Sequence, residues 1–395
     1  MNDAAGSLRD DEDGAAVPLR VEFITKLGQL PLLKEQWEAL NRHLSDHEAP
    51  FFQSHGWNFH VAKVRLERSS ERYRLCVATV WRGHRMIGIW PLSVQRRWGV
   101  WIAKSLDDPF GQFAGVLFEN KADIVPGVAA VLRTLRARKS ADALQIDSVV
   151  NATSLHEALM SAGARNRVSN TAVYVDLRQC RSFDEFMGAI NKKTRKNLRN
   201  LWNRLRRVVE IEHVISDQRI QLRNVIEDTF EARLAWIHEY GRTSPAFRDQ
   251  DFRPIVRGLS GSGAIELLGF SLVSKDGFVS SQWGFTYLGR YYAYLSAKNS
   301  RYDEFSPGRL HLGMVIEACK ARGIEVLELM PPAADYKLSW SDRTKRLDVF
   351  VMPMSVRGYL VLNPLVDKIG FATRSVSRLI PQSIRRPLVR LLNRS

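Results

Sequence analysis

The sequence has few cysteines and no long apolar run. Its three cysteines, Cys76, Cys180 and Cys319, are spread over 395 residues, which argues against a disulfide framework or a zinc cluster. No stretch approaches the roughly 18 consecutive apolar residues of a transmembrane helix. The opening residues, MNDAAGSLRDDEDGAA, lack the basic start and apolar run of a signal peptide. We therefore expect a cytoplasmic protein.

Acidic residues are scarce relative to basic ones, since 42 Asp and Glu stand against 58 Lys and Arg, a formal charge of +16. The excess is concentrated in two segments. Residues 192–207 contain eight Lys or Arg and no acid, and residues 356–395 contain eight Lys or Arg and one acid, Asp367. Such segments either attract phosphate-rich partners, namely nucleic acid, anionic lipid or a phosphorylated ligand, or are solvated helix faces.

The hydrophobic fraction of 45% excludes a disordered chain, and its periodicity predicts a mixed α/β (α+β) fold. Each half shows helices and strands in a similar order, although no sequence repeat is visible. We expect an acidic tail over 1–18, domains over 19–168 and 169–355, and a basic amphipathic tail over 356–395. The strands expected in the second domain include 171–177, 264–274, 278–287, 290–297, 324–330 and 347–353.

The segment 290–337 carries the clearest chemical signal. A predicted strand is followed by a loop and by Ser306-Pro307-Gly308-Arg309-Leu310, which open a helix. Free N–H groups and the helix dipole at such a position suit a pyrophosphate, Gly308 permits close approach, and Arg309 adds positive charge. The alternative is an ordinary N-terminal turn of a helix.

This segment resembles the C-terminal part of the BioF2-like (CelD-type) acetyltransferase domain of the GNAT superfamily. The resemblance spans about 20–355. Residues 191–199 are also similar to a basic helix shared with Fem-type transferases. The matching positions are Phe51, Phe52, Gln53, Ser54, Trp57, Pro91, Leu92, Ser105–Asp108, Tyr302, Ser306–Gly308, Leu310, Ile316, Glu317, Gly323, Leu327, Leu329, Tyr336, Lys337 and Trp340.

The resemblance implies tandem GNAT-like domains, acetyl-CoA or another acyl-CoA as co-substrate, and the Ser306-Pro307-Gly308 region as the pyrophosphate loop. It also suggests a role in exopolysaccharide, cellulose or cell-envelope biosynthesis. The glycine-rich loop pattern of the superfamily is absent here. That absence keeps a non-catalytic, GNAT-like scaffold open as an alternative.

Four residues are candidates for catalysis. Lys337 matches an aromatic-Lys motif near the reacting acyl group of Fem-type relatives, where its ammonium would stabilise an oxyanion; otherwise it is a surface lysine. Tyr336 is a proton donor to the leaving thiolate or a packing residue. Asp335 is a base, an orienting partner of Lys337 or a helix cap. Glu328 alternates with apolar neighbours in its strand and is either a base facing the crevice or a solvent-facing side chain.

The expected acceptor site consists of Gln282, Trp283, Tyr292, Tyr294 and Trp236. For Tyr292, Tyr294 and Trp236 the alternative is a packing role. The nine histidines form no metal-binding pattern. His43 and His47 are four residues apart but have no accompanying carboxylate motif, so we expect no metal site.

The leading functional hypothesis is an acyl-CoA-dependent N-acyltransferase that acts on a small-molecule or saccharide amine, or on a hydroxyl. A Fem-like transferase that uses aminoacyl-tRNA is the alternative enzyme. The short basic amphipathic pieces of 356–395 predict either contact with an anionic membrane, at the inner face of the membrane, or packing across the protein.

Overall fold

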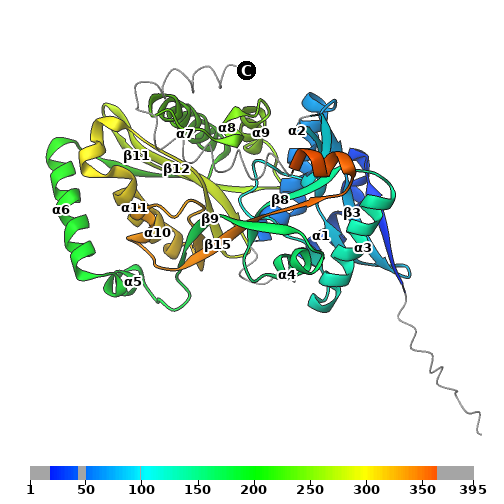
Figure 1. Ribbon diagram of the computed structural model, residues 1–395. Helices are drawn as coiled ribbons and strands as arrows, with labels where there is room; N and C mark the ends of the chain where they lie inside the picture. Colours follow the sequence, from blue (N-terminus) through cyan, green and yellow to red (C-terminus); the bar gives the residue numbers. More distant parts are fainter. Residues whose placement is uncertain (1–17, 43–49, 98, 363–395) are drawn as a thin grey trace, which may run out of the picture.

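The computed structural model describes residues 18–42, 50–97 and 99–362 (Figure 1). The expected acidic tail, apart from its last residue, lies outside the described residues. The expected basic tail lies outside them as well, apart from 356–362, which are helical. In the described ranges, no helix is long and apolar enough to cross a bilayer.

The first half of the chain begins with a strand and two helices, continues with antiparallel strands, and closes with helix, strand, helix and strand. Ser54 caps the second of these helices, as predicted, because its hydroxyl accepts from the Trp57 N–H. The elements are β1 (Leu19–Ile24), α1 (Lys34–Asn41), α2 (His55–Ser69), β2 (Tyr73–Leu75), β3 (Val77–Arg82), β4 (Arg85–Trp90), β5 (Leu92–Arg97), β6 (Val100–Ser105), β7 (Leu117–Phe118), α3 (Ile124–Ala137), β8 (Ala143–Val150), α4 (Ser154–Ser161) and β9 (Arg165–Asp176).

The second half repeats this order after two additional helices. The mixed α/β fold with helices flanking twisted sheets is therefore confirmed. The elements are α5 (Phe183–Ala189), α6 (Lys192–Val208), β10 (Glu212–Ser216), α7 (Arg219–Glu239), α8 (Pro245–Arg248), α9 (Phe252–Leu259), β11 (Glu266–Ser274), β12 (Gly277–Tyr287), β13 (Arg290–Lys298), α10 (Pro307–Ala321), β14 (Val326–Glu328), α11 (Asp335–Leu338) and β15 (Thr344–Pro353).

One large sheet joins the two halves. Its order is β10-β11-β12-β13-β14-β9-β15-β8-β6-β5-β2, beside a smaller sheet β1-β3-β4-β7. The last strand, β15, lies between β8 and β9 and pairs antiparallel with both, so the end of the second half adds a strand to the first. β9 starts at Arg165 rather than at the predicted 171 and continues through the expected linker. The domain bounds themselves stay a prediction.

An aromatic cluster packs the first half against β12 and β13. The Phe51 ring stacks on Phe285 with centroids 4.0 Å apart and lies 5.5 Å from the Tyr292 ring. Trp57 packs against Phe285, and its Nε1 donates to the Asp107 carboxylate at 2.7 Å. The early motif that carried part of the family resemblance therefore forms the contact between the two halves.

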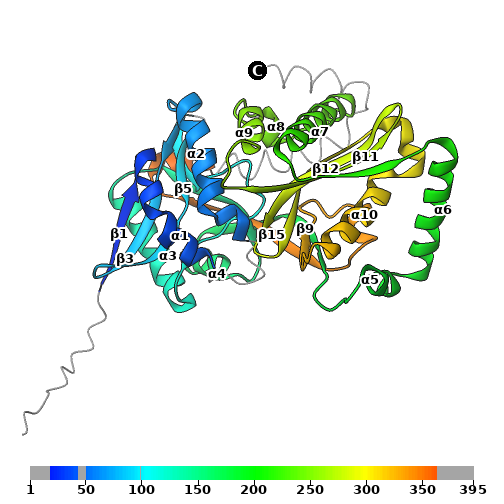
Figure 2. The ribbon, with the colours of Figure 1, turned by 180° about the vertical axis from the view of Figure 1, so that it is seen from behind.

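Helices cover β11, β12 and β13 on both faces. α7, α8 and α9 lie on one face and α10 on the other (Figures 1 and 2). The predicted basic helix forms α6, which buries Leu198 and Leu205 and leaves most of its basic side chains exposed. It stands at one end of the molecule. β13 is therefore covered by α7 on one face and by α10 on the other.

Candidate functional site

The site begins where β13 and β14 separate. The two strands pair in parallel only over residues 290–292 and 326–328. The pairing of β13 with β12 also shifts here, from Trp283 opposite Leu295 to Phe285 opposite Tyr292. This shift is a β-bulge, which bends β13 away from its neighbour. Beyond it, residues 293–298 pair with no strand on the β14 side in the part of the chain that the structure describes.

Gly284 makes the bulge possible. A Cβ at this position would lie 1.9 Å from the Tyr292 carbonyl oxygen, closer than any van der Waals contact allows. We expect Gly284→Ala to lower the free energy of unfolding by roughly 2–3 kcal/mol, because backbone has to shift. Chemical denaturation measures this, with Gly308→Ala as the control, since a Cβ at Gly308 meets nothing within 4 Å. An unchanged unfolding midpoint for Gly284→Ala would show that the bulge tolerates a side chain.

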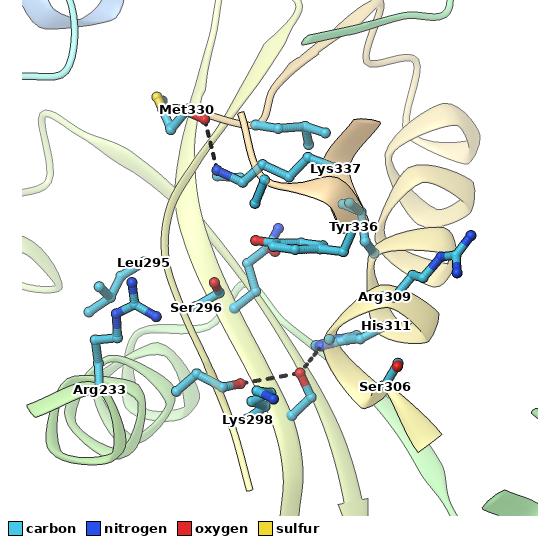
Figure 3. Close-up of a pocket in the computed structure, with 18 of the residues that line it drawn as sticks. Arg233, Leu295, Ser296, Lys298, Ser306, Arg309, His311, Met330, Tyr336 and Lys337 are labelled. Atoms are coloured by element: carbon cyan, nitrogen blue, oxygen red, sulfur yellow. Dashed lines mark hydrogen bonds between the residues drawn. The ribbon is translucent and has the colours of Figure 1, made fainter. Parts of the chain in front are cut away.

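A cavity of about 780 Å³ occupies the gap between the separated strands. One side is formed by α7, the other by the start of α10, and the far wall by residues 329–337 (Figure 3). Residues 293–298 of β13 cross between the two sides. The other lining residues are Ala232, Arg233, Trp236, Arg242, Ser280, Gln282, Asp303, Ser306, Gly308, Arg309, His311, Leu312, Leu329–Pro332, Ala334–Lys337 and Ser339.

The start of α10 places three of the five expected phosphate-binding residues on the cavity: Ser306, Gly308 and Arg309. Ser306 has φ +51°, which turns the chain sharply into the helix. The Arg309 side chain is held by a bond from Nε to the Ser339 hydroxyl at 2.9 Å. Pro307 and Leu310 are buried instead and anchor the helix.

The backbone offers fewer amide donors here than the sequence predicted. Pro307 has no N–H, and the amides of Arg309 and Leu310 both donate to the Ser306 carbonyl, at 3.0 and 3.2 Å. An anion at this end would meet chiefly the Gly308 amide and the Arg309 guanidinium. The open space above Gly308 leaves room for such a group.

Lys337 is buried and not the surface lysine of the alternative prediction. It is 8% exposed, and its amine donates to the carbonyls of Met330 at 2.8 Å and Pro332 at 3.1 Å. Burial, with a contribution from the nearby Arg233, lowers its pKa to about 7. A pKa near neutrality makes the unprotonated amine accessible at physiological pH. In that form both N–H groups can donate to the two carbonyls, and the lone pair can accept a proton.

Tyr336 and Asp335 also lie on the cavity. The Tyr336 hydroxyl is directed toward Ser296 (Figure 3), and desolvation of the phenol raises its pKa although the side chain as a whole is 37% exposed. Asp335 opens α11 and is exposed. No hydrogen bond joins the Asp335 carboxylate to Lys337 among the described residues, so the orienting role proposed for Asp335 has no contact to support it.

Glu328 lies outside the cavity and is buried, so it is neither the expected base facing the crevice nor the solvent-facing side chain of the alternative. Its carboxylate is fully buried and bonds to the Arg290 guanidinium at 3.0 Å and the Lys345 amine at 2.5 Å. The three residues belong to strands β13, β14 and β15 of the large sheet, in which β9 lies between β14 and β15. Glu328 is thus the shared counterion of two buried cations.

Three of the five expected acceptor residues, Gln282, Tyr294 and Trp236, line the cavity, and two do not. Trp283 and Tyr292 are fully buried in the core that packs the halves together. Gln282 and Trp283 are neighbours in β12 and so face opposite sides of the sheet. Tyr294 packs in the same aromatic cluster as Tyr292 and also reaches the cavity, because β13 no longer pairs with β14 beyond Tyr292. Tyr294 also donates to the Phe110 carbonyl at 3.0 Å, which connects the cavity wall to the first half.

The sequence did not single out Arg233, Arg242 or His311 as site residues. The two arginines belong to α7 and the residues just after it, and only the fold brings them opposite α10. His311 is buried beside Ser280, with Nδ1 3.1 Å from the hydroxyl, and burial lowers its pKa to about 3. It is therefore neutral at physiological pH. A histidine in an otherwise apolar helix stretch was the one available signal.

Comparisons with known proteins agree with this geometry. Residues 192–338 match the family model described as an acetyltransferase (GNAT) domain. This part of the chain is therefore similar to GNAT-type acetyltransferase domains. No curated protein matches the chain. Among the described residues, no cluster of side chains suits a metal ion.

Solved structures show the same fold over most of the chain. FemX aligns with a TM-score of 0.56 and 11% identity, covering 83% of this chain and 96% of FemX. The C-terminal domain (DUF2156) of a protein described as a lysylphosphatidylglycerol synthetase from Agrobacterium fabrum aligns with a TM-score of 0.52 and 11% identity, covering 85% of this chain and 96% of that domain. At such identities the likeness concerns the fold alone.

Proposed function

We propose that the protein transfers an acyl group from acyl-CoA to an amine, or less readily a hydroxyl, of a small-molecule or saccharide acceptor. The observation that carries this proposal is the cavity between the separated strands, with the start of α10 on one side, α7 on the other and Lys337 in the wall between them. Two substrates that enter from opposite faces would meet at Lys337. Orientation of both reactants is the main requirement of acyl transfer.

The residues on the α10 side fit an acyl-CoA. Its phosphates would be held by Gly308, Arg309 and Lys298, and the open space above Gly308 would admit them. The amide-containing arm of the acyl-CoA would pair with the edge of β13 at 293–298 as an added strand. When bound, the thioester supplies an activated acyl carbon.

Lys337 would accept the proton of the attacking amine. Its pKa of about 7 suits this task, because a general base is most effective when its pKa is near the working pH. The centre of the Tyr336 ring lies 6.0 Å from the Lys337 amine. Tyr336 would donate a proton to the leaving thiolate. The BioF2-like resemblance supports a place in exopolysaccharide, cellulose or cell-envelope biosynthesis.

Acetyl-CoA titration by calorimetry tests the donor. We expect Gly308→Leu to weaken acetyl-CoA binding at least tenfold, since the side chain would fill the phosphate-binding space, without loss of stability. Gly188→Leu on α5 is the matched control, because a Cβ there also meets nothing within 4 Å and the position is outside the cavity. Equal acetyl-CoA affinities for both variants would show that the phosphates do not bind at the start of α10. A wild-type protein that binds no acyl-CoA would favour the non-catalytic scaffold.

A second candidate, a Fem-like transferase that takes its acyl group from aminoacyl-tRNA, is supported by α6. Lys192, Arg195, Lys196, Arg199 and Arg206 have the spacing of one helix face. In the described ranges, only Arg204 of this helix forms an ion pair with an acid, Glu304, at 3.0 Å. Glu304 belongs to the 3-10 helix Ser300–Phe305, directly before α10. RNA binding that falls steeply with salt would support this candidate.

Contact with an anionic membrane through residues 356–395 is a further proposal, which rests on the basic amphipathic composition of that segment. Vesicle sedimentation with and without this segment tests it.

A further inference from the structure

The α7 side of the cavity carries two arginines around one tryptophan. The Arg233 guanidinium lies 4.4 Å from the centre of the Trp236 ring, and that of Arg242 lies 6.0 Å from the same ring. All three residues line the cavity. Arg233 extends from α7 toward Leu295 and Ser296 of β13 (Figure 3). Stacking on an aromatic face orients a guanidinium and leaves its N–H edge available for a bidentate partner.

These two arginines have no acidic partner among the described residues. The nearby acids are used elsewhere, because Glu227 and Glu231 of α7 pair with Arg253 and Arg257 of α9. On the α10 side, Asp303 pairs with Lys298 at 2.6 Å. The other cavity carboxylate, Asp335, is exposed at the start of α11. The α7 side is therefore positively charged and uncompensated.

The positive charge extends to the reacting position. Arg233 contributes to lowering the Lys337 pKa, and burial lowers the pKa of Arg233 itself. Like charges that converge in a half-buried cavity repel one another, and a bound anion would offset this repulsion. The α10 side already supplies Arg309 and Gly308 for the donor phosphates. The arginines on the opposite, α7 side are therefore not required to bind the donor phosphates.

We propose that the acceptor carries a carboxylate or phosphate group, which Arg233 binds against Trp236 while Arg242 contributes at the α7 side of the cavity. This inference rests on the proposed function in that it takes the α7 side as the acceptor side. It narrows the acceptor from any amine to an acidic one, such as an amino acid, an amino sugar phosphate or an amino uronic acid. Neutral amines would bind far more weakly.

Anion binding can be measured without knowing the acceptor. The full chain is labelled with ¹³C at the lysine Cε, and the pH titration of Lys337 is followed by NMR, with Lys337→Arg used to assign the resonance. Sodium phosphate and sodium acetate are added separately at constant ionic strength. We expect each effective anion to raise the Lys337 pKa by about 0.5 or more in a saturable manner, because it neutralises the adjacent arginine. The two salts distinguish phosphate from carboxylate.

Three variants locate the anion. Arg233→Met should abolish the response, whereas Arg309→Met, on the α10 side, and Arg223→Met, an exposed arginine of α7 outside the cavity, should retain it. A wild-type protein that does not respond to either anion overturns the inference. So does a response that survives Arg233→Met or disappears in Arg309→Met.

The acidic-acceptor proposal and the acyltransferase proposal can each fail without the other. Acetyl-CoA binding without an anion response at Arg233 would refute the acidic acceptor and leave the acyltransferase proposal standing. An anion response at Arg233 without acetyl-CoA binding would refute the acyl-CoA donor and leave the anion site standing.

Discussion

Replacing Lys337 with methionine is expected to lower acyl transfer by roughly 10²–10⁴-fold, the usual contribution of a general base, while acetyl-CoA still binds. Methionine is similar in length and apolar, and it removes an amine whose burial is itself unfavourable. We therefore expect the fold to persist. Calorimetry with acetyl-CoA, thermal unfolding and a thiol-release assay together distinguish loss of the base from loss of structure.

The pH dependence of the transfer rate shows whether Lys337 acts as a neutral base or as an ammonium. A base must be neutral, so the rate should rise with pH through about 7 and then level off. Lys337→Arg, which stays protonated, should remove this rise. A rate that falls as the pH passes through 7 would instead support the ammonium as an oxyanion donor, the role that the family resemblance implied. Lys320, a lysine of α10 outside the cavity, provides the control as Lys320→Met.

Replacing Glu328 with glutamine is expected to lower the free energy of unfolding by roughly 3–5 kcal/mol, since two buried cations would lose their common counterion. The measurement is chemical denaturation at pH 7. Glu325→Gln, an exposed residue just before the same strand, is the control and should change the free energy by less than about 0.5 kcal/mol.

The Glu328 experiment also separates structure from catalysis. The folded fraction of Glu328→Gln should bind acetyl-CoA normally and retain its transfer rate per folded molecule. A variant with normal stability and no transfer would reinstate Glu328 as the catalytic base.

Local sequence signals predicted the elements around the site well. Alternation and turn residues placed β11, β12 and β13 within two residues of their observed bounds, and Pro307 and Gly323 bracketed α10. These signals depend on neighbours in the chain: proline starts a helix, glycine ends one, and apolar residues alternate along a strand. The short segment that opens α10 was identified as part of a site for the same reason.

The division of the acceptor residues could not be predicted in this way. Tyr292 and Tyr294 are two residues apart and would share one face of a regular strand. Both rings do pack in the aromatic cluster around Phe52, and Tyr294 also reaches the cavity because β13 no longer pairs with β14 beyond Tyr292. The point at which two strands separate depends on segments far apart in the chain and has no reliable signature within either strand.

The sequence by itself determined the mixed α/β class, the order of most elements, the basic helix and the helix start that lines the cavity, because each follows from short-range periodicity and turn chemistry. Only the tertiary structure decided the environment of the charged groups. It buried Lys337 against two carbonyls, enclosed Glu328 between two cations, and brought Arg233 opposite α10. Charge states and ligand contacts depend on which distant residues share a low-dielectric space, and that is set by the packing of strands and helices far apart in the chain.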